Sequence, residues 1–414
     1  MENKKLDRNV ILTGLTSFFT DVSSEMVYPI LQAFLTAVMT GAKALLGPIL
    51  GVIEGIAEST ASLLKVFSGY WSDRLRKRKG MTIAGYGTSA AAKGLFLLAS
   101  LGWYFVFLAR FLDRVGKGIR TAPRDALISE STPKDAQGRA FGYQRGMDFA
   151  GATVGAALCY FLAREFLDPL GQSLTDMNAF YLIFLISIIP AFLGVIALFF
   201  VSEKKEPAEL SAKARPKPNL RLSGYDRNLK VFFLAQFIFT LGNSSNQFML
   251  LRSMDVGHLL STVILMYIVF NTAATALSPV FGSLSDRIGR KRLLVLGYVL
   301  YAIVYAAFGF IDPSLNWLMW VFWPLYGIYY AMTEGVEKAM VSDLAPKESK
   351  ATALGFYHTI VGIGLLPASV IAGFLFSLLP GLPFWFGGAM ALTSVIILAV
   401  FVKENKNPVS GETK

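Results

Sequence analysis

Twelve long apolar stretches, separated by shorter polar intervals, run through the 414 residues of this sequence. Stretches such as 182–201 and 384–402 come close to the roughly 20 apolar residues that a helix needs to cross a bilayer. Unpaired backbone groups in lipid cost several kcal/mol each, so we expect every crossing to be an α-helix. The predicted spans cover residues 10–38, 44–71, 81–101, 103–130, 140–163, 177–202, 231–251, 257–285, 293–312, 315–343, 351–379 and 382–402.

The longest polar interval, 202–230, is rich in proline, lysine and arginine. Six predicted spans precede it and six follow it. The pattern therefore predicts an N-terminal six-helix bundle over 1–202, a cytoplasmic linker over 203–229 and a C-terminal six-helix bundle over 230–414.

The positive charges test the orientation of these spans. Cytoplasmic loops of membrane proteins carry an excess of Lys and Arg. With both termini in the cytoplasm, 27 of the 39 Lys and Arg residues fall in cytoplasmic segments, 9 in spans and 3 in external loops. The net charge of +11 therefore reflects topology and does not call for a nucleic-acid partner. We expect a multi-pass protein of the inner (cytoplasmic) membrane with both termini in the cytoplasm.

Composition agrees with a membrane protein and argues against an enzyme. Only 16% of residues are charged, against about 25% in soluble domains, and the mean hydropathy is +0.51. One cysteine and two histidines cannot form a disulfide or a metal cage. No phosphate-binding loop signature is present, so ATP is not the expected energy source. We predict no enzymatic activity, no cofactor and no metal.

One polar motif occurs twice. Residues 69–79 read GYWSDRLRKRK and residues 282–292 read GSLSDRIGRKR, an offset of 213 positions. The same offset places Glu58 opposite Asn271 and Arg145 opposite His358. A register constant over about a hundred residues indicates an internal duplication, with each half one structural repeat.

The motif resembles G-x-L-A-D-R-x-G-R-K, which the major facilitator superfamily of secondary transporters carries between helices 2 and 3 and again between helices 8 and 9. The first copy departs from it at Trp71 and Arg76. The resemblance spans the chain and implies an all-α membrane protein with 12 transmembrane helices in two pseudo-symmetric six-helix bundles. It also implies a central site, alternating access and a monomer.

The resemblance implies a conformational latch at the cytoplasmic end of each half. Its residues are Gly69, Asp73, Arg74, Lys77, Asp125, Gly282, Asp286, Arg287 and Arg290. The counterpart of Asp125 in the second repeat is Lys338, so the second latch is expected to be connected differently. In the fifth predicted helix, Gly142, Gly151 and Gly155 partly match the antiporter motif of the superfamily; ordinary helix packing explains them equally well.

Charged residues inside spans cost about 2.5–3.5 kcal/mol each at a helix centre and therefore indicate function. Four acids of the first two spans, one turn apart in pairs, are the candidates for proton coupling: Asp21, Glu25, Glu54 and Glu58. A carboxyl group removed from water can exchange protons near neutral pH. The alternative is that these acids only form ion pairs with Lys65, Lys93 or Arg114.

A basic stripe runs along the fourth predicted helix, since Arg110, Arg114 and Lys117 recur at spacings of 4 and 3. It can face only a polar cavity or the other half. It serves either as a binding face for an anion or as a scaffold of ion pairs to Asp113, Asp148 and Glu25. The expected cavity residues are Arg110, Arg114, Lys117, Arg145, Asn243, Asn246, Gln247, Asn271, Tyr326, Tyr330, Glu334 and His358.

The charged residues inside the predicted spans lie mainly in the N-terminal half, so we expect the proton-coupling residues there. We expect the C-terminal half to supply hydrogen-bonding groups and aromatic surface. The predicted function is proton-coupled export of a small organic molecule, with the substrate, protons and the lipid bilayer as partners. Two alternatives stay open. One is uptake or exchange of an organic anion through the basic stripe, and the other is a membrane sensor or binding protein without transport.

Overall fold

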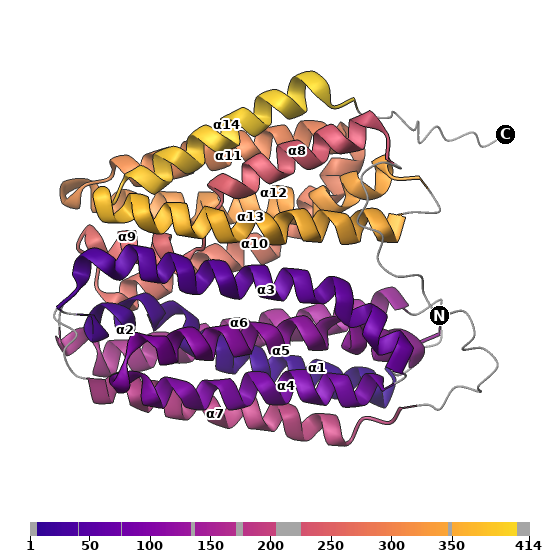
Figure 1. The fold of residues 1–414 in the computed structure, drawn as a ribbon, viewed down its shortest axis with the longest axis horizontal. Helices are drawn as coiled ribbons and strands as arrows, with labels where there is room; N and C mark the ends of the chain where they lie inside the picture. Colours follow the sequence, from indigo (N-terminus) through magenta and orange to yellow (C-terminus); the bar gives the residue numbers. More distant parts are fainter. Residues whose placement is uncertain are drawn as a thin grey trace.

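The computed structural model describes residues 6–39, 41–75, 77–133, 137–170, 177–203, 225–346 and 350–403. Within these ranges the chain is helical and contains no strand. The helices form two bundles that lie side by side along the length of the molecule (Figure 1). The predicted twelve-helix architecture in two halves is the one observed.

The N-terminal half makes six crossings. Its first crossing joins two helices through a single turn of 3₁₀-helix at Tyr28–Ile30, where Pro29 interrupts the α-helical pattern. The third crossing ends in a 3₁₀ segment, Leu95–Leu101. The α-helices are α1 (Arg8–Val27), α2 (Leu31–Val38), α3 (Leu46–Leu75), α4 (Arg78–Gly94), α5 (Trp103–Glu130), α6 (Gln137–Phe166) and α7 (Met177–Phe199).

The C-terminal half repeats this plan, and its first crossing is again interrupted. One continuous span over 231–251 was expected, but the helix breaks at residues 243–246, Asn-Ser-Ser-Asn, whose side chains compete with the backbone for hydrogen bonds. Its helices are α8 (Arg227–Gly242), α9 (Gln247–Asp255), α10 (Leu260–Ile288), α11 (Arg290–Phe310), α12 (Met319–Leu344), α13 (Lys350–Leu378) and α14 (Leu382–Phe401).

Six of the described helices are long and apolar enough to cross a membrane by length and composition alone: α6, α7, α10, α11, α13 and α14. The remaining crossings are broken, like α1–α2 and α8–α9, or carry charged residues, like α3, α5 and α12. The apolar helices thus embed the molecule, and the charged and broken ones gather the polar groups between them.

The two halves meet through α3 against α13 and α6 against α10. Glycines allow the closest approach: a Cβ atom at Gly47 would collide with the carbonyl of Gly373, and one at Gly51 with the carbonyl of Ser369. These residues lie toward the end of the molecule away from both termini, called the far end here. The opposite end, where α1 starts and α14 stops, is called the terminal end (Figure 1).

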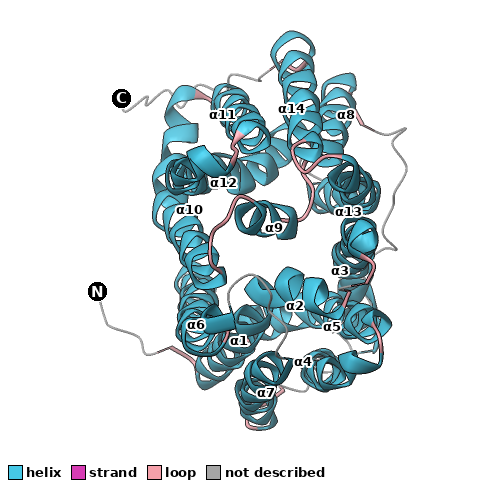
Figure 2. Cartoon of the chain, turned by 90° about the vertical axis from the view of Figure 1, so that its left-hand side faces the viewer, coloured by secondary structure: helices cyan, strands magenta, loops and turns pink. Residues whose placement is uncertain are grey.

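Contacts between the halves concentrate at the far end. There α9 lies between the bundles and touches α2 (Figure 2). Gln247 donates from Nε2 to the carbonyl of Tyr28 at 2.8 Å, and Asp168 accepts hydrogen bonds from Ser261. Seven side-chain hydrogen bonds between described residues of the two halves lie between mid-length, where Ser59 donates to the carbonyl of Gly362, and the far end. The far end is therefore closed.

Candidate functional site

A cavity of about 340 Å³ lies between the halves. The C-terminal half supplies most of its wall, through α8, the break after α8, α12 and α13, whereas the N-terminal half supplies three residues. The lining residues are Tyr28, Glu58, Lys65, Gln236, Phe239, Thr240, Asn243, Ser244, Ser245, Asn246, Tyr326, Tyr329, Tyr330, Thr333, Glu334, Glu337, Lys338, Tyr357, His358, Val361 and Leu365. The volume falls in the usual range for small-molecule sites, about 300–1,000 Å³.

The helix break and a row of tyrosines form one wall of this cavity. Tyr326 donates from its hydroxyl to Oδ1 of Asn246 at 2.8 Å, and Nδ2 of Asn243 donates to the hydroxyl of Tyr329 at 3.4 Å. The rings of Tyr326 and Tyr329 lie 5.2 Å apart, and that of Tyr330 stands nearly perpendicular to Tyr329 at 6.0 Å. The break thus exposes amide groups beside an aromatic surface.

Glu337 is the buried acid of this wall. Its carboxylate accepts hydrogen bonds from the hydroxyls of Tyr298 at 2.7 Å and Tyr357 at 2.5 Å, and the described residues give it no ion-pair partner within 4 Å. Glu334, one turn earlier, lies 3.5 Å from Nζ of Lys338 and 3.7 Å from Nη2 of Arg145. Arg145 belongs to α6, so this second contact joins the two halves.

The basic stripe of α5 is largely neutralised by α3. Arg110 binds Glu54 through two hydrogen bonds of 2.8 Å, and the Glu54 side chain is fully buried. Ser245, in the break of the other half, donates to the same carboxylate at 3.0 Å. Arg114 lies 3.0 Å from Glu58. The pairs therefore form with α3 rather than with Asp113, Asp148 and Glu25, which were the expected scaffold.

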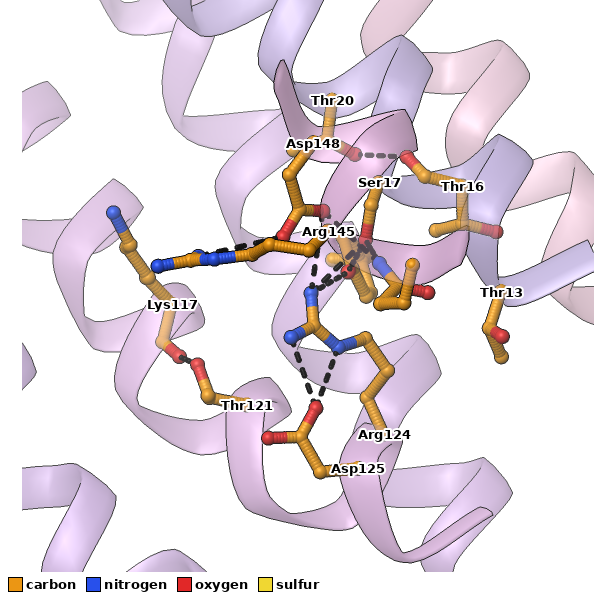
Figure 3. A network of polar contacts seen from close by, with 12 residues as sticks. Thr13, Thr16, Ser17, Thr20, Lys117, Thr121, Arg124, Asp125, Arg145 and Asp148 are labelled. Carbon is orange, nitrogen blue, oxygen red and sulfur yellow. Dashed lines mark hydrogen bonds and ion pairs between the residues drawn. The ribbon is translucent and has the colours of Figure 1, made fainter. Parts of the chain in front are cut away.

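Lys117 and Lys65 differ from the arginines. Neither lysine forms an ion pair within 4 Å with a described residue. Lys65 lines the cavity, while Lys117 extends its ammonium group away from the neighbouring polar network (Figure 3). The unpaired positive charge of the site therefore sits on lysines of α3 and α5.

The acids of α1 are placed without a cation in direct contact. Asp21 is half-buried and forms no ion pair with a described residue, and Oε2 of Glu25 is buried without a hydrogen-bond partner. The hydroxyl of Tyr267, from the C-terminal half, lies beside Glu25. Lys93 does not bind these acids; its ammonium donates to the hydroxyls of Ser23 at 2.6 Å and Ser24 at 3.0 Å.

A second polar network lies in the N-terminal half toward the terminal end (Figure 3). Arg124 of α5 donates to the hydroxyl of Ser17 on α1 at 3.0 Å and lies 3.8 Å from Asp148 on α6. Gln144 donates to Ser17 at 2.6 Å and to Asp148 at 3.0 Å. This network ties α1, α5 and α6 together, so it holds the terminal end of this half as one unit.

The expected latch residues lie at the terminal end, and only part of the first latch can be described. The side chains of Asp73 and Arg74 lie outside the described residues. Asp125 pairs with its neighbour Arg124 at 2.9 Å. A Cβ atom at Gly69 would contact Ala122 on α5, and the ammonium-bearing Lys77 is exposed.

The second latch is connected through a different acid of α12. Arg290 lies 3.0 Å from Asp286 and also binds Asp343, one and a half turns beyond Lys338. Asp343 thus takes the place that the repeat offset assigned to Lys338. Arg287 is exposed, and a Cβ atom at Gly282 would meet nothing within 4 Å.

The remaining expected cavity residues divide into two groups. Asn243, Asn246, Tyr326, Tyr330, Glu334 and His358 line the cavity. Gln247 is engaged with the carbonyl of Tyr28 at the far end, and Asn271 with the carbonyl of Tyr267 within its own helix. Arg110, Arg114, Lys117 and Arg145 stand beside the lining rather than in it.

Several lining residues were not expected from the sequence. Tyr329 lies between the two predicted tyrosines of α12, and its i+3 spacing from Tyr326 already placed it on the same face. Tyr28 and Ser245 gave no signal, because each lies at a helix break, and Tyr357 gave none, because its partner Glu337 lies on another helix of the same half. No cluster of three or more His, Cys, Asp or Glu in the described part of the chain could hold a metal ion.

Comparison with known proteins places this architecture in a family. Residues 13–251 and 232–414 both match the Major Facilitator Superfamily. An uncharacterized MFS-type transporter of Methanocaldococcus jannaschii is 39% identical over 402 residues, 96% of this chain and 95% of the relative. The multi-drug resistance efflux pump PmrA of Streptococcus pneumoniae is 27% identical over 205 residues, 47% of this chain and 48% of that protein.

Solved structures agree on the fold. The crystal structure of a D-xylose-proton symporter superposes with a TM-score of 0.73 at 16% identity, covering 96% of this chain and 98% of that one. The family consists of multi-pass membrane transporters rather than enzymes. This chain therefore belongs to the major facilitator superfamily.

Proposed function

We propose that this transporter exports a small organic molecule across the cytoplasmic membrane in exchange for protons. The observation that carries the proposal is the polar and aromatic cavity between the two halves, with the far end closed by direct contacts. A site at the interface of two repeats is what alternating access requires, because rocking the halves exposes it to each side in turn. PmrA, which is described as an efflux pump, favours export as the direction.

The distribution of Lys and Arg supports a cytoplasmic position for the terminal end. With that orientation the described conformation is closed to the outside, and a substrate would enter the cavity from the cytoplasm. Such a conformation is the loading state of an exporter.

Proton coupling is assigned to α1. Glu54 and Glu58 are held by arginines, so each would have to break an ion pair before it could take up a proton. Asp21 and Glu25 have no such partner and share one face of the helix. In the proposed cycle, one of them accepts a proton from outside and releases it inside while the substrate moves outward.

The test uses the full chain in proteoliposomes that contain a pH-sensitive dye. A panel of metabolites and drugs is added in the presence and absence of a pH gradient, and both substrate flux and proton movement are recorded. We expect flux of a transported compound to dissipate the gradient. In Asp21→Asn or Glu25→Gln vesicles, gradient-driven accumulation should be lost while counterflow exchange continues.

The control is Glu165→Gln, which neutralises an exposed acid near the end of α6 that does not line the cavity. This variant should keep gradient-driven accumulation. Full accumulation in both α1 variants would remove α1 from the mechanism, and flux that is indifferent to the pH gradient in the unmodified protein would remove proton coupling itself.

A further inference from the structure

We propose that the cavity binds an aromatic carboxylate, with its anionic group between Lys65 of α3 and Lys338 of α12, beside His358, and its ring against the tyrosines of α12. This inference names the substrate class of the transport proposed above and rests on it. It differs from one alternative that the sequence left open, in which the basic stripe of α5 binds the anion.

Lys65 is the cation of the cavity wall that lacks a partner among the described residues. Its ammonium group is repelled by Lys117, Lys338 and Arg114 and attracted by Glu58. Lys65 is half-buried and faces the cavity, and a partly buried charge without a partner is stabilised by a counter-ion. A bound carboxylate would supply it.

The other basic groups converge on the same place from the opposite half. Lys65 and Lys338 are the charges that act on the imidazole of His358, and all three residues line the cavity. They come from α3, α12 and α13, so an anion bound among them would touch both halves at once. A transported substrate has to make such a contact, because its binding energy must be available to move the halves.

The acids of the cavity do not compete for Lys65. Glu58 lies 3.0 Å from Arg114, and Glu337 is held by two tyrosine hydroxyls. Glu334 is shared between Lys338 at 3.5 Å and Arg145 at 3.7 Å. Each acid therefore has its own hydrogen-bond or ion-pair partners before any ligand enters.

Arg110 of α5 is excluded as the anion site by its contacts with Glu54. Arg110 already uses Nε and Nη2 for the carboxylate of Glu54, in the paired geometry that an incoming carboxylate would require. A ligand would have to displace a fully buried acid to reach it. At the lysine site, Lys65 has no ion pair to give up with a described residue, and Lys338 gives up only its 3.5 Å contact with Glu334, which keeps Arg145 as a partner.

The tyrosines of α12 indicate the chemistry of the part of the ligand that carries no charge. Tyr326 and Tyr330 lie one turn apart on α12, with Tyr329 between them, and their rings meet at tilted or perpendicular angles. Such a surface packs well against a flat ring, and Asn243 and Asn246 of the helix break offer amide groups at its edge.

Binding of the anion would also help to close the terminal end. Lys65 and Lys338 belong to different halves, and like charges facing each other across an opening oppose its closure. When the carboxylate engages Lys338, Glu334 keeps Arg145 of α6 as its ion-pair partner. The substrate thus removes a repulsion between the halves, while the attraction between Glu334 and Arg145 remains.

The test measures equilibrium binding to the purified full-length protein by calorimetry and by the shift in unfolding temperature. Because no gradient is present, the result does not depend on direction or proton coupling. The probes are benzoate and 2-naphthoate, compared with the corresponding amides and methylamines, which keep the ring and change only the charge. We expect the carboxylates to bind at least tenfold more tightly than the amides, and the amines to bind most weakly.

Two variants locate the site. Lys65→Gln should weaken carboxylate binding at least tenfold and leave binding of the amides unchanged. Arg164→Gln, which removes an exposed cation on α6 outside the cavity, should change neither. Equal carboxylate affinity in Lys65→Gln and the unmodified protein, tighter binding of the amines, or no binding of either carboxylate would each overturn the inference. If Lys65→Gln fails to fold, the affinities of the unmodified protein for the carboxylates, amides and amines still test the inference.

Discussion

Substitution of Asp168 by alanine is expected to open the far end. Asp168 follows α6 in the N-terminal half, and its carboxylate accepts hydrogen bonds from the backbone N–H of Ser261 at 3.1 Å and from the Ser261 hydroxyl. Ser261 is the second residue of α10, whose own N-cap, Leu259, supplies no side-chain hydrogen bond. The carboxylate of one half therefore caps a helix of the other.

The size of the effect follows from these two bonds. A hydrogen bond contributes about 0.5–1.5 kcal/mol net, and loss of a capping side chain costs about 0.5–2 kcal/mol. Taken together, Asp168→Ala should raise the free energy of the far-closed state by about 1–2 kcal/mol. In the far-open state the two residues are apart and the substitution has no effect. The ratio of far-open to far-closed molecules should therefore rise roughly 5- to 30-fold.

Distances between two spin labels at the far end measure this ratio. The single cysteine, Cys159, is buried and can be replaced by alanine, and exposed Leu45 and Leu379 at the far end of α3 and α13 then carry the labels. The matched control is Asp312→Ala. Asp312 also caps backbone N–H groups at the far end, at 2.8 and 3.2 Å, but within its own half. Unchanged distances in Asp168→Ala, or the same change in both variants, would refute the reasoning.

Other substitutions test the packing of single elements. Arg110→Met removes the ion-pair partner of the buried Glu54 carboxylate and should lower the free energy of unfolding by about 3–5 kcal/mol, measured by chemical denaturation. The double variant Arg110→Met/Glu54→Leu should recover part of that loss in the same assay. Asn9→Ala removes three hydrogen bonds of 2.8–2.9 Å and should cost about 2–3 kcal/mol by the same measurement. Gly151→Leu should abolish folded protein in gel filtration, because a side chain there meets the backbone of α1, while Gly142→Ala, with open space around it, should be tolerated.

The membrane spans were predictable because hydropathy acts locally. The predicted span 103–130 coincides with α5, and the other predicted ends agree with the helices to within a few residues. The interruptions at Tyr28–Ile30 and at residues 243–246 were the exceptions, and the second shows the reason. The apolar residues on either side hide it in a hydropathy pattern, although Asn243 and Asn246 were singled out as polar groups of the cavity.

The partners of the charged residues could be predicted only in part. Pairing of Glu58 with Arg114 was one of the alternatives that the sequence left open, and the structure contains it at 3.0 Å. The pair of Glu54 with Arg110 was not anticipated, because spacing along a helix gives the face of a residue but not the rotation of that helix against its neighbour. The far-closed conformation was also beyond prediction, since both conformations of a transporter contain the same helices.

In both halves, an asparagine at the start of the first helix binds the chain that follows the last helix. The 213-residue repeat offset does not align these two asparagines. Each half begins with Asp-Arg-Asn, at residues 7–9 and 226–228, an offset of 219. Asn9 exchanges hydrogen bonds of 2.8 and 2.9 Å with the backbone of Ser202 after α7, and Asn228 pairs in the same two-way manner with Lys403 after α14. Each clasp joins the first helix of a half to the chain leaving its last.

A second pair of contacts reinforces each clasp at the same end. Lys79 donates from Nζ to the carbonyl of Phe199 at the end of α7, and Lys291 donates to the carbonyl of Ala399 at the end of α14, both at 2.8 Å. Cations are favoured at helix C-termini, which explains why a basic run follows both copies of the repeated motif. Since each half is tied together by its own bonds, the contacts that must change during transport are those between the halves. In the proposed site, repulsion between Lys65 and Lys338 opposes closure of the terminal end, and the Asp168 cap holds the far end closed. Both interactions therefore favour the same, far-closed conformation.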